Sequence, residues 1–289
     1  ARPYMNRNPL TVMPPKRQTG VTLIELMVGI AIGLLVIAVA MGSLMVSRGI
    51  SGTVSEASTL QQQASYAFRV IGQQIRQAGS MELNLTPSIL STPGADYAMS
   101  PVAFDPPDPS EARPPFSRAS STLTGVATPL SFTIGYQNYT ETITAPSGNV
   151  TASLLRDCLG QNPAMAASGT VAATPVLTSR FERNASNELV CEGAGGGGAQ
   201  AVVGNVTDMR VKYIGQAPGT TNLQYHPSTY AGPWSNIYAI EVCLELTGTE
   251  ATPTSGQTYK NCSDNDTPYG DRLKMVFRNV FQIRSQGLS

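Results

Sequence analysis

The chain has few charged residues and a single histidine. Asp, Glu, Lys and Arg make up 13% of its 289 residues, about half the share that is usual in soluble proteins. The 19 basic and 19 acidic side chains balance, so the basic excess of a nucleic-acid-binding protein is absent. His226 is the only histidine and no Cys-x-x-Cys pair occurs, which argues against zinc. No nucleophile with a base, metal pair or paired carboxylates is recognisable, so we expect no enzymatic activity and no cofactor.

One long segment lacks charge altogether. Leu26 to Val46 contains 21 residues without an ionisable side chain or a proline, and a helix of this length spans a hydrocarbon core of roughly 30 Å. The run is too long for the apolar part of a signal peptide, and no small-x-small cleavage site follows it. Lys16 and Arg17 precede the run. The positive-inside tendency therefore predicts a cytoplasmic N-terminus, with the chain beyond about Arg48 outside.

Glu25 stands at the start of this run. A carboxylate near the hydrocarbon costs about 2.5–3.5 kcal/mol on insertion scales, so its presence calls for a partner or a purpose. One interpretation is an ordinary signal anchor, in which Glu25 is tolerated at the interface and suits the helix dipole. The residue order favours another. A basic leader ending at Gly20, then Val21-Thr-Leu-Ile-Glu25-Leu and an apolar run, resembles the class III signal of type IV pilins and type II secretion pseudopilins. Val21 departs from the Phe or Met that the family usually has.

The resemblance implies a mechanism. A prepilin peptidase would cut between Gly20 and Val21 and methylate the new amino group. Glu25 would then meet the Val21 amine of a neighbouring subunit as the helices bundle into a filament. Pairing compensates a charge in apolar surroundings and sets the axial register of the helices. The resemblance thus makes Glu25 an assembly residue.

Helical periodicity resumes after Gly52 and predicts an amphipathic helix up to a glycine cap at Gly79. The apolar face is Val54, Ala57, Leu60, Ala64, Ala67, Phe68, Ile71, Ile75 and Ala78, and Glu56, Gln61, Gln62, Gln73 and Arg76 lie opposite. We expect the apolar face to pack on the protein's own sheet. Gly42, Gly49 and Gly52 each lower helix propensity by about 1 kcal/mol and mark a place that can bend.

Strands are predicted from about residue 123 onward. Residues 80–120 crowd six prolines between Pro101 and Pro115, and they form a linker, a partner-binding ridge or, as we favour, an irregular covering loop. Alternating apolar and polar residues then predict antiparallel strands at 130–136, 140–144, 150–155, 178–183, 188–191, 206–214, 236–246 and 273–284. The glycines at 193–198 lack the strand, helix and lysine of a phosphate-binding loop. The predicted fold class is α+β, with a long N-terminal hydrophobic helix packed on an antiparallel β-sheet.

Four cysteines lie beyond the apolar run: Cys158, Cys191, Cys243 and Cys262. An even number in an exported domain predicts two disulfides, for which three connectivities exist. We favour Cys158–Cys191 and Cys243–Cys262, because neighbours in sequence close the shorter loops. Each disulfide would contribute about 2–4 kcal/mol of stability.

Two further clusters are weaker candidates for sites. Asp264, Asp266 and Asp271 form an acidic turn with Asn261, Asn265 and Gly270. Oxygen ligands at short spacing can hold calcium, but the spacing is not that of an EF-hand and such turns are common without metal, so we expect no metal. The aromatic stretch from Tyr225 to Trp234, around His226, either touches a neighbouring subunit or, as we favour, packs as a core loop.

The C-terminal half resembles PilW-type minor pilins. The matching segments are Asn205 to Tyr213, the loop ending at Trp234, the strand around Ala239 and a terminal strand ending at Arg284. The minor pseudopilin that caps type II secretion filaments shares the plan, but the residues around Cys158 and Cys191 fit the first disulfide of PilW-type pilins better. The implied organisation is a class III leader over residues 1–20, a transmembrane and filament-core helix over 21–50, an amphipathic helix over 51–79, and an exported β-rich domain over 80–289.

The resemblance implies a minor type IV pilin that helps to initiate or cap pilus assembly. It would sit in the bacterial inner membrane as a single-pass protein with a periplasmic C-terminal domain, and in the pilus after assembly. Its partners would be other minor pilins, the major pilin, the inner-membrane assembly platform and prepilin peptidase. Twitching motility would belong to the pilus as a whole. Two alternatives stay open: a minor pseudopilin of type II secretion, and a tip adhesin or ligand-binding module on a pilin stem.

Overall fold

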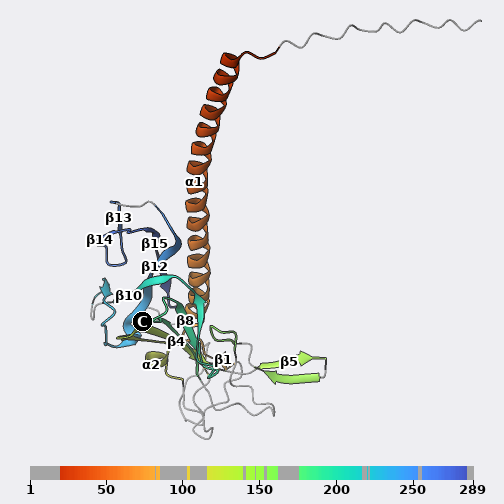
Figure 1. Cartoon of the computed structure of the whole chain (residues 1–289). Helices are drawn as coiled ribbons and strands as arrows, with labels where there is room; N and C mark the ends of the chain where they lie inside the picture. The colour runs from red at the N-terminus through yellow and green to blue at the C-terminus, as the bar shows by residue number, and fades with distance from the viewer. Residues whose placement is uncertain are drawn as a thin grey trace, which may run out of the picture. The chain divides into compact units, whose positions relative to one another are not determined.

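The computed structural model describes residues 20–81, 83–84, 103–104, 116–138, 141–146, 148–152, 155–161, 176–216, 220, 222–252 and 256–284 (Figure 1). The leader before Gly20 and most of the proline-rich stretch lie outside these residues. The chain divides into two compact units, Ala1–Gly52 and Thr53–Ser289.

The described residues of the first unit are Gly20 to Thr22 and the N-terminal part of helix α1 (Leu23–Gln77). Between Gly20 and Gly52 every residue is exposed except Gly33 and Gly52, which are half-exposed. Within the described residues, α1 is the one helix long and apolar enough to cross a membrane. The helix runs without a break through Gly42, Gly49 and Gly52, and no proline interrupts the hydrogen-bond ladder there.

The second unit begins with the C-terminal part of α1, which buries one face. Its buried residues follow at steps of three and four: Leu60, Ala64, Ala67, Ile71, Gln74 and Ile75. The buried stripe starts later than the sequence predicts, since Val54 is 64% exposed. The helix ends as predicted, with the Ala78 N–H donating to the Ile75 carbonyl at 3.1 Å and with Gly79 at a φ of 67°. Only glycine adopts that left-handed conformation without strain.

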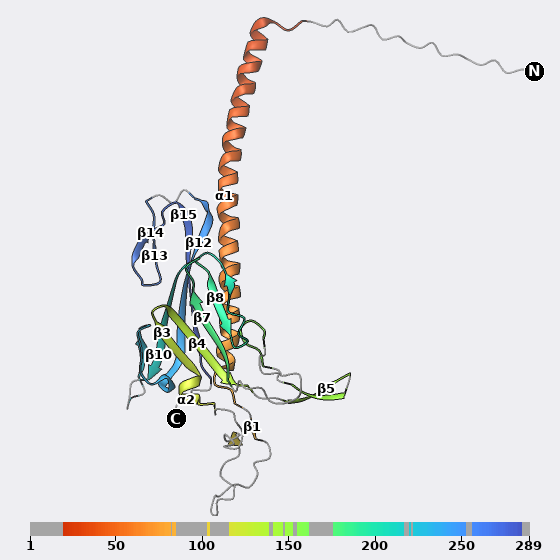
Figure 2. The same ribbon diagram turned by 60° about the horizontal axis from the view of Figure 1, so that its bottom comes forward.

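The strands of the second unit form two main antiparallel sheets (Figure 2). The five-stranded sheet has the order β3–β4–β7–β8–β9, with β3 at Leu123–Ala127, β4 at Leu130–Gln137, β7 at Val176–Arg183, β8 at Leu189–Gly193 and β9 at Ala199–Val203. The four-stranded sheet has the order β11–β10–β12–β15, with β10 at Val206–Gln216, β11 at Leu223–His226, β12 at Ile237–Ala251 and β15 at Arg272–Gln282.

Shorter elements complete the described part of the chain. Three two-stranded pairs are β1 (Leu83–Asn84) with β2 (Ala103–Phe104), β5 (Glu141–Ala145) with β6 (Gly148–Ala152), and β13 (Thr258–Lys260) with β14 (Asp266–Pro268). Two short helical turns are α2 (Arg118–Ser121) and the 3₁₀ turn η2 (Trp234–Asn236). The predicted α+β class is confirmed: one long apolar N-terminal helix accompanies antiparallel sheets.

The division into two sheets was not predicted, and Asn205 explains where it occurs. The residue adopts a positive φ of 60° between β9 and β10, a conformation that asparagine tolerates better than most residues. Its carbonyl accepts from the Thr247 N–H at 2.9 Å, and the Val206 N–H donates to the Asn187 carbonyl at 2.8 Å. The chain therefore leaves one sheet at Val203 and enters the other at Val206. Strand β9 was missed because a glycine-rich turn precedes its weakly alternating residues.

One hydrophobic core joins α1 to both sheets. From the helix it takes Leu60 and Ile71, from the five-stranded sheet Phe132, and from the four-stranded sheet Val242 and Leu244. The rings of Phe132 and Phe181 stack with centroids 5.3 Å apart. All buried members of this core come from Leu60 onward.

A buried polar network crosses the core at Gln74, which is 5% exposed. Its Oε1 accepts from the Ser179 hydroxyl at 2.9 Å and from the Tyr136 hydroxyl at 3.2 Å. Ser179 Oγ in turn accepts from the Cys158 N–H at 3.0 Å, and the Tyr136 hydroxyl also contacts the Arg156 carbonyl. Burial, and then the nearby Asp157 charge, raises the pKa of Tyr136. The network ties α1 to β4, to β7 and to the turn that holds Cys158.

Candidate functional site

The start of α1 is organised by Thr22. Gly20 and Val21 precede the helix and are exposed. Thr22 Oγ1 accepts from the Glu25 N–H at 3.4 Å, and its carbonyl accepts from the Leu26 N–H at 3.1 Å. A threonine three residues before a glutamate is the pattern of a capping box. This role of Thr22 was not predicted, although the Thr-x-x-Glu spacing in the sequence indicates it.

The Glu25 carboxylate lies in the first turn of α1 and is exposed. It forms no ion pair with any residue that the structure describes. The N-terminal end of a helix carries a partial positive charge, which favours a carboxylate in this turn. Glu25 is therefore held in a helix start that suits its charge, and its oxygens are open to a partner from outside the chain.

Apolar side chains surround the helix after Glu25 on all sides. From Leu26 to Val46 the large apolar side chains are more than half exposed, from 51% for Ile37 to 75% for Met45. A run of this kind is stable only in lipid or against other apolar helices. The site thus combines an accessible carboxylate with a long apolar surface.

The prokaryotic N-terminal methylation motif matches residues 15–41, which include Gly20, Val21 and Glu25. The chain carries a prepilin-type N-terminus. Among solved structures it is similar to a type IV-like pilin from Thermus thermophilus, with a TM-score of 0.37, 11% sequence identity and coverage of 79% of this chain and 97% of that chain. No curated protein matches the chain significantly.

Two disulfides lie in the second unit. Cys158 is bonded to Cys191 on β8, with Cα atoms 6.4 Å apart, and Cys243 on β12 is bonded to Cys262, with Cα atoms 5.8 Å apart. This is the pairing that the shorter loops favour. Asp157 shapes the first turn, because its Oδ1 accepts from the Leu159 and Gln161 N–H groups at 2.9 and 2.8 Å.

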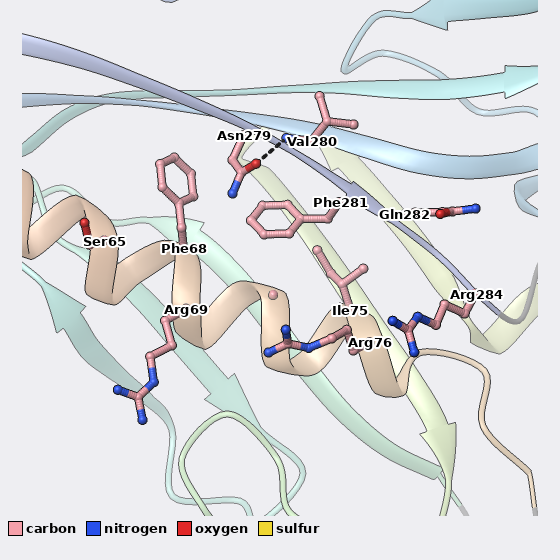
Figure 3. A pocket seen from close by; sticks show the side chains of 11 residues that line it. Ser65, Phe68, Arg69, Ile75, Arg76, Asn279, Val280, Phe281, Gln282 and Arg284 are labelled. Carbon is pink, nitrogen blue, oxygen red and sulfur yellow. Dashed lines mark hydrogen bonds between the residues drawn. The ribbon is translucent and has the colours of Figure 1, made fainter.

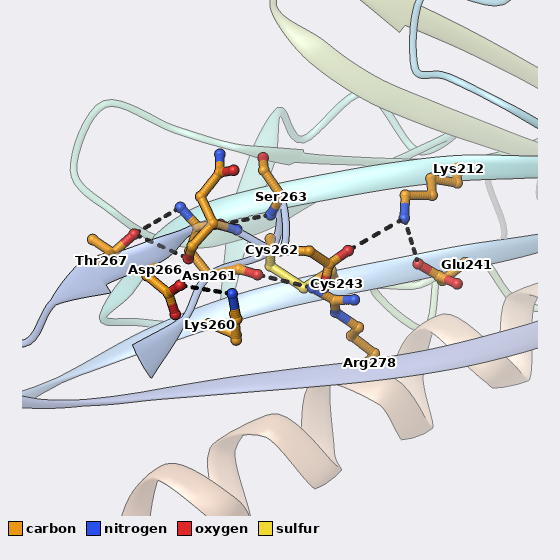
Figure 4. A network of polar contacts seen from close by, with 12 residues as sticks. Lys212, Glu241, Cys243, Lys260, Asn261, Cys262, Ser263, Asp266, Thr267 and Arg278 are labelled. Atoms are coloured by element: carbon orange, nitrogen blue, oxygen red, sulfur yellow. Dashed lines mark hydrogen bonds and ion pairs between the residues drawn. A yellow bond between two sulfur atoms is a disulfide. The ribbon is translucent and has the colours of Figure 1, made fainter. Parts of the chain in front are cut away.

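The acidic turn near Cys262 contains two ion pairs (Figure 4). Arg278 Nη2 lies 2.7 Å from Asp264 Oδ1, and Lys260 Nζ lies 2.8 Å from Asp266 Oδ2. The hydrogen bond from Arg278 lowers the pKa of Asp264. The described ranges contain no cluster of three Asp, Glu, His or Cys residues that could hold a metal. Basic side chains thus engage Asp264 and Asp266, two of the three carboxylates that the calcium alternative requires, and the absence of a metal stays a prediction.

The aromatic stretch packs mainly as a loop on the four-stranded sheet. The ring of buried Tyr213 lies edge-on to that of Trp234, with centroids 5.0 Å apart. The ring centroids of His226 and Tyr230 are 4.5 Å apart. The Tyr213 hydroxyl is buried without a hydrogen-bond partner in the described part of the protein, and burial raises its pKa to about 12. Tyr225 differs from the expectation of a core loop, because 59% of it is exposed.

Glu56 was predicted to face away from the sheet, but it has partners there. The Glu250 N–H donates to Glu56 Oε1 at 2.8 Å. A Cβ added at Gly248 would lie only 2.4 Å from the carboxylate carbon of Glu56, so glycine leaves room for the carboxylate in its present position. The carboxylate fixes the end of β12 to α1. Sequence spacing gave no signal for the contact, because 194 residues separate the two positions.

Proposed function

We propose that the chain is a minor type IV pilin that helps to initiate or cap a pilus by packing α1 against the helices of other pilins. The observation that carries the proposal is the combination at the helix start. A methylation motif over residues 15–41 contains a first-turn carboxylate that forms no ion pair with a described residue, and an exposed, uncharged helical surface follows it.

The proposed mechanism begins with cleavage after Gly20 and methylation of the Val21 amine by prepilin peptidase. In the membrane the apolar run of α1 contacts lipid. In a filament it contacts other helices, and Glu25 pairs with the Val21 ammonium of a neighbour. Because an unpaired carboxylate is costly in apolar surroundings, this pair favours assembly and sets the height of one helix against the next. Thr22 supports the pair by capping the helix end that presents Glu25.

The cellular setting follows from the same features. The unassembled protein is a single-pass protein of the bacterial inner membrane, and its disulfide-containing unit lies in the periplasm. Its partners are other minor pilins, the major pilin and the inner-membrane assembly platform. Its role is structural, and pairing at Glu25 is a binding event without a chemical step.

The test replaces Glu25 with alanine and with glutamine in the full chain, expressed in the bacterium that encodes it. Glutamine keeps the size of the side chain and removes only its charge. We expect N-terminal sequencing to find Val21 as the first residue, and filament number to fall at least tenfold in both variants. Glu56→Gln is the control, since it removes the same charge from α1 outside the apolar run.

A chain that is not cut after Gly20, or filaments that assemble normally without Glu25, would refute the mechanism. The filament that is lost in the Glu25 variants distinguishes a role in type IV pili from a role in type II secretion. Loss of surface pili with intact type II secretion supports the pilin role. The reverse result identifies a pseudopilin and contradicts it.

A further inference from the structure

A groove of about 630 Å³ lies between α1 and β15 in the second unit (Figure 3). We call it the α1–β15 groove; its floor is Phe68, Ile75 and Phe281, and its rim includes Arg76 and Arg284. The rings of Phe68 and Phe281 lie 6.0 Å apart between centroids. Gly72 opens the floor, because a Cβ there would lie 3.0 Å from the Phe281 ring.

The rim of the groove is positively charged, and no described residue supplies a counter-charge. Arg69, Arg76 and Arg284 line it and are exposed. None of the three forms an ion pair with a residue in the described ranges, and no carboxylate lines the groove. Other arginines of the same unit are paired with acids: Arg180, Arg210 and Arg278. The α1–β15 groove therefore presents arginine side chains that can bind an anionic group of another molecule.

The strand beside the groove is an edge strand. In the described residues β15 has one neighbouring strand, β12. The Ile283 N–H donates to the Tyr238 carbonyl at 2.7 Å, and hydrogen bonding alternates along an antiparallel strand, so the backbone groups of Val280 and Gln282 point outward. The Val280 N–H indeed bonds to the side chain of Asn279, at 2.9 Å. An incoming strand can replace that local acceptor.

We propose that the α1–β15 groove binds an extended acidic segment of a neighbouring filament subunit. The segment adds to the edge of β15 beside Val280 and places its carboxylates against Arg76 and Arg284. An exposed edge strand is a template for strand addition, and arginine binds carboxylates through paired hydrogen bonds. Val280, which is 50% exposed, gives the segment an apolar contact. The proposal rests on the proposed function, because it takes the neighbour to be a filament subunit.

Symmetry disfavours a second copy as the occupant of the α1–β15 groove. A second copy that paired through the same edge would bring its own Arg76 and Arg284 to the same groove. Like charges would then face each other, which destabilises such a pairing.

The test places p-benzoylphenylalanine at position 280 of the full chain in its own bacterium and identifies the product of photocrosslinking by mass spectrometry. We expect a crosslink to an acidic segment of another subunit that carries the N-terminal methylation motif. Arg76→Glu and Arg284→Glu should each reduce this crosslink at least tenfold. Arg272→Glu is the matched control, since Arg272 is exposed on the same strand outside the groove, and it should leave the yield unchanged.

Several outcomes overturn the proposal: no crosslink, a crosslink to lipid, a crosslink to a second copy, or a yield that does not respond to Arg76 and Arg284. Retention of both disulfides in each variant, checked by non-reducing mass spectrometry, shows that the fold is intact. N-terminal sequencing of the same samples separates the two proposals. Cleavage after Gly20 without the crosslink refutes the groove and leaves the pilin role standing, whereas an uncut chain refutes the pilin role itself.

Discussion

Replacing Gln74 with methionine tests whether the buried polar network holds α1 to the five-stranded sheet. Methionine has nearly the same size but no acceptor. The Tyr136 hydroxyl retains the Arg156 carbonyl as a partner. The Ser179 hydroxyl loses the acceptor 2.9 Å away and is fully buried. The variant therefore leaves one buried donor unsatisfied.

The expected cost follows from that orphaned donor. A buried hydroxyl without an acceptor costs about 1–3 kcal/mol, and a volume-conserving apolar replacement adds less than about 1.5 kcal/mol. We expect the free energy of unfolding to fall by about 2 kcal/mol. Gln73→Met changes the neighbouring exposed residue and should lie within about 0.5 kcal/mol of the unmodified protein.

Urea unfolding of the full chain in a nonionic detergent measures the difference. Trp234, the single tryptophan, reports on the second unit by fluorescence. The slope of the free energy against urea should stay constant while the midpoint shifts. Equal midpoints for Gln74→Met and Gln73→Met would show that the network contributes nothing to stability.

Two further predictions concern the four-stranded sheet and use the same assay. Tyr213→Phe removes a buried hydroxyl without a partner, so stability near neutral pH should be unchanged or higher. Burial raises the pKa of Tyr213 from 10.0 to about 12. Below pH 10 the hydroxyl is protonated in both the folded and the unfolded protein. As the pH rises from 10 toward 12 only the unfolded protein loses this proton, so the free energy of unfolding falls. The phenylalanine variant should show a weaker fall over that range, and an identical pH profile would contradict the assignment. Replacing Cys243 and Cys262 together with serine opens a loop of 19 residues, which by chain entropy costs about 3 kcal/mol; a loss below about 1 kcal/mol would contradict this estimate.

The helix and many strands were predictable because their signals are local. The stripe from Leu60 to Ala78 follows from helical periodicity alone, and β12 and β15 follow from alternation. The arrangement of the strands depends on contacts between distant residues. Ser131 pairs with Glu182 across β4 and β7, and neither residue carries a mark of that pairing. The change of sheets depends on the backbone of Asn205, whose left-handed conformation the sequence permits but does not require.

The residues of the candidate sites were predictable where their signal is local and unpredictable where it depends on contacts between distant residues. Gly20, Val21 and Glu25 lie within six consecutive residues, so the sequence alone singles them out. Arg76 and Arg284 come together only because β15 runs beside α1. For the acidic turn we expected no metal. The ion pair of Asp266 with Lys260 lies within the turn, whereas that of Asp264 with Arg278 depends on β15, which the spacing of the aspartates does not reveal.

The core that starts at Leu60 has a consequence for the order of events during biogenesis. None of its buried members belongs to the apolar run, so the globular unit can complete its folding and form its disulfides while the run is still in lipid. When the run exchanges lipid for the helices of a filament, as proposed, no core residue has to move. Extraction from the membrane then changes only the surroundings of the apolar run. The second unit is already folded, so assembly requires no refolding of its core.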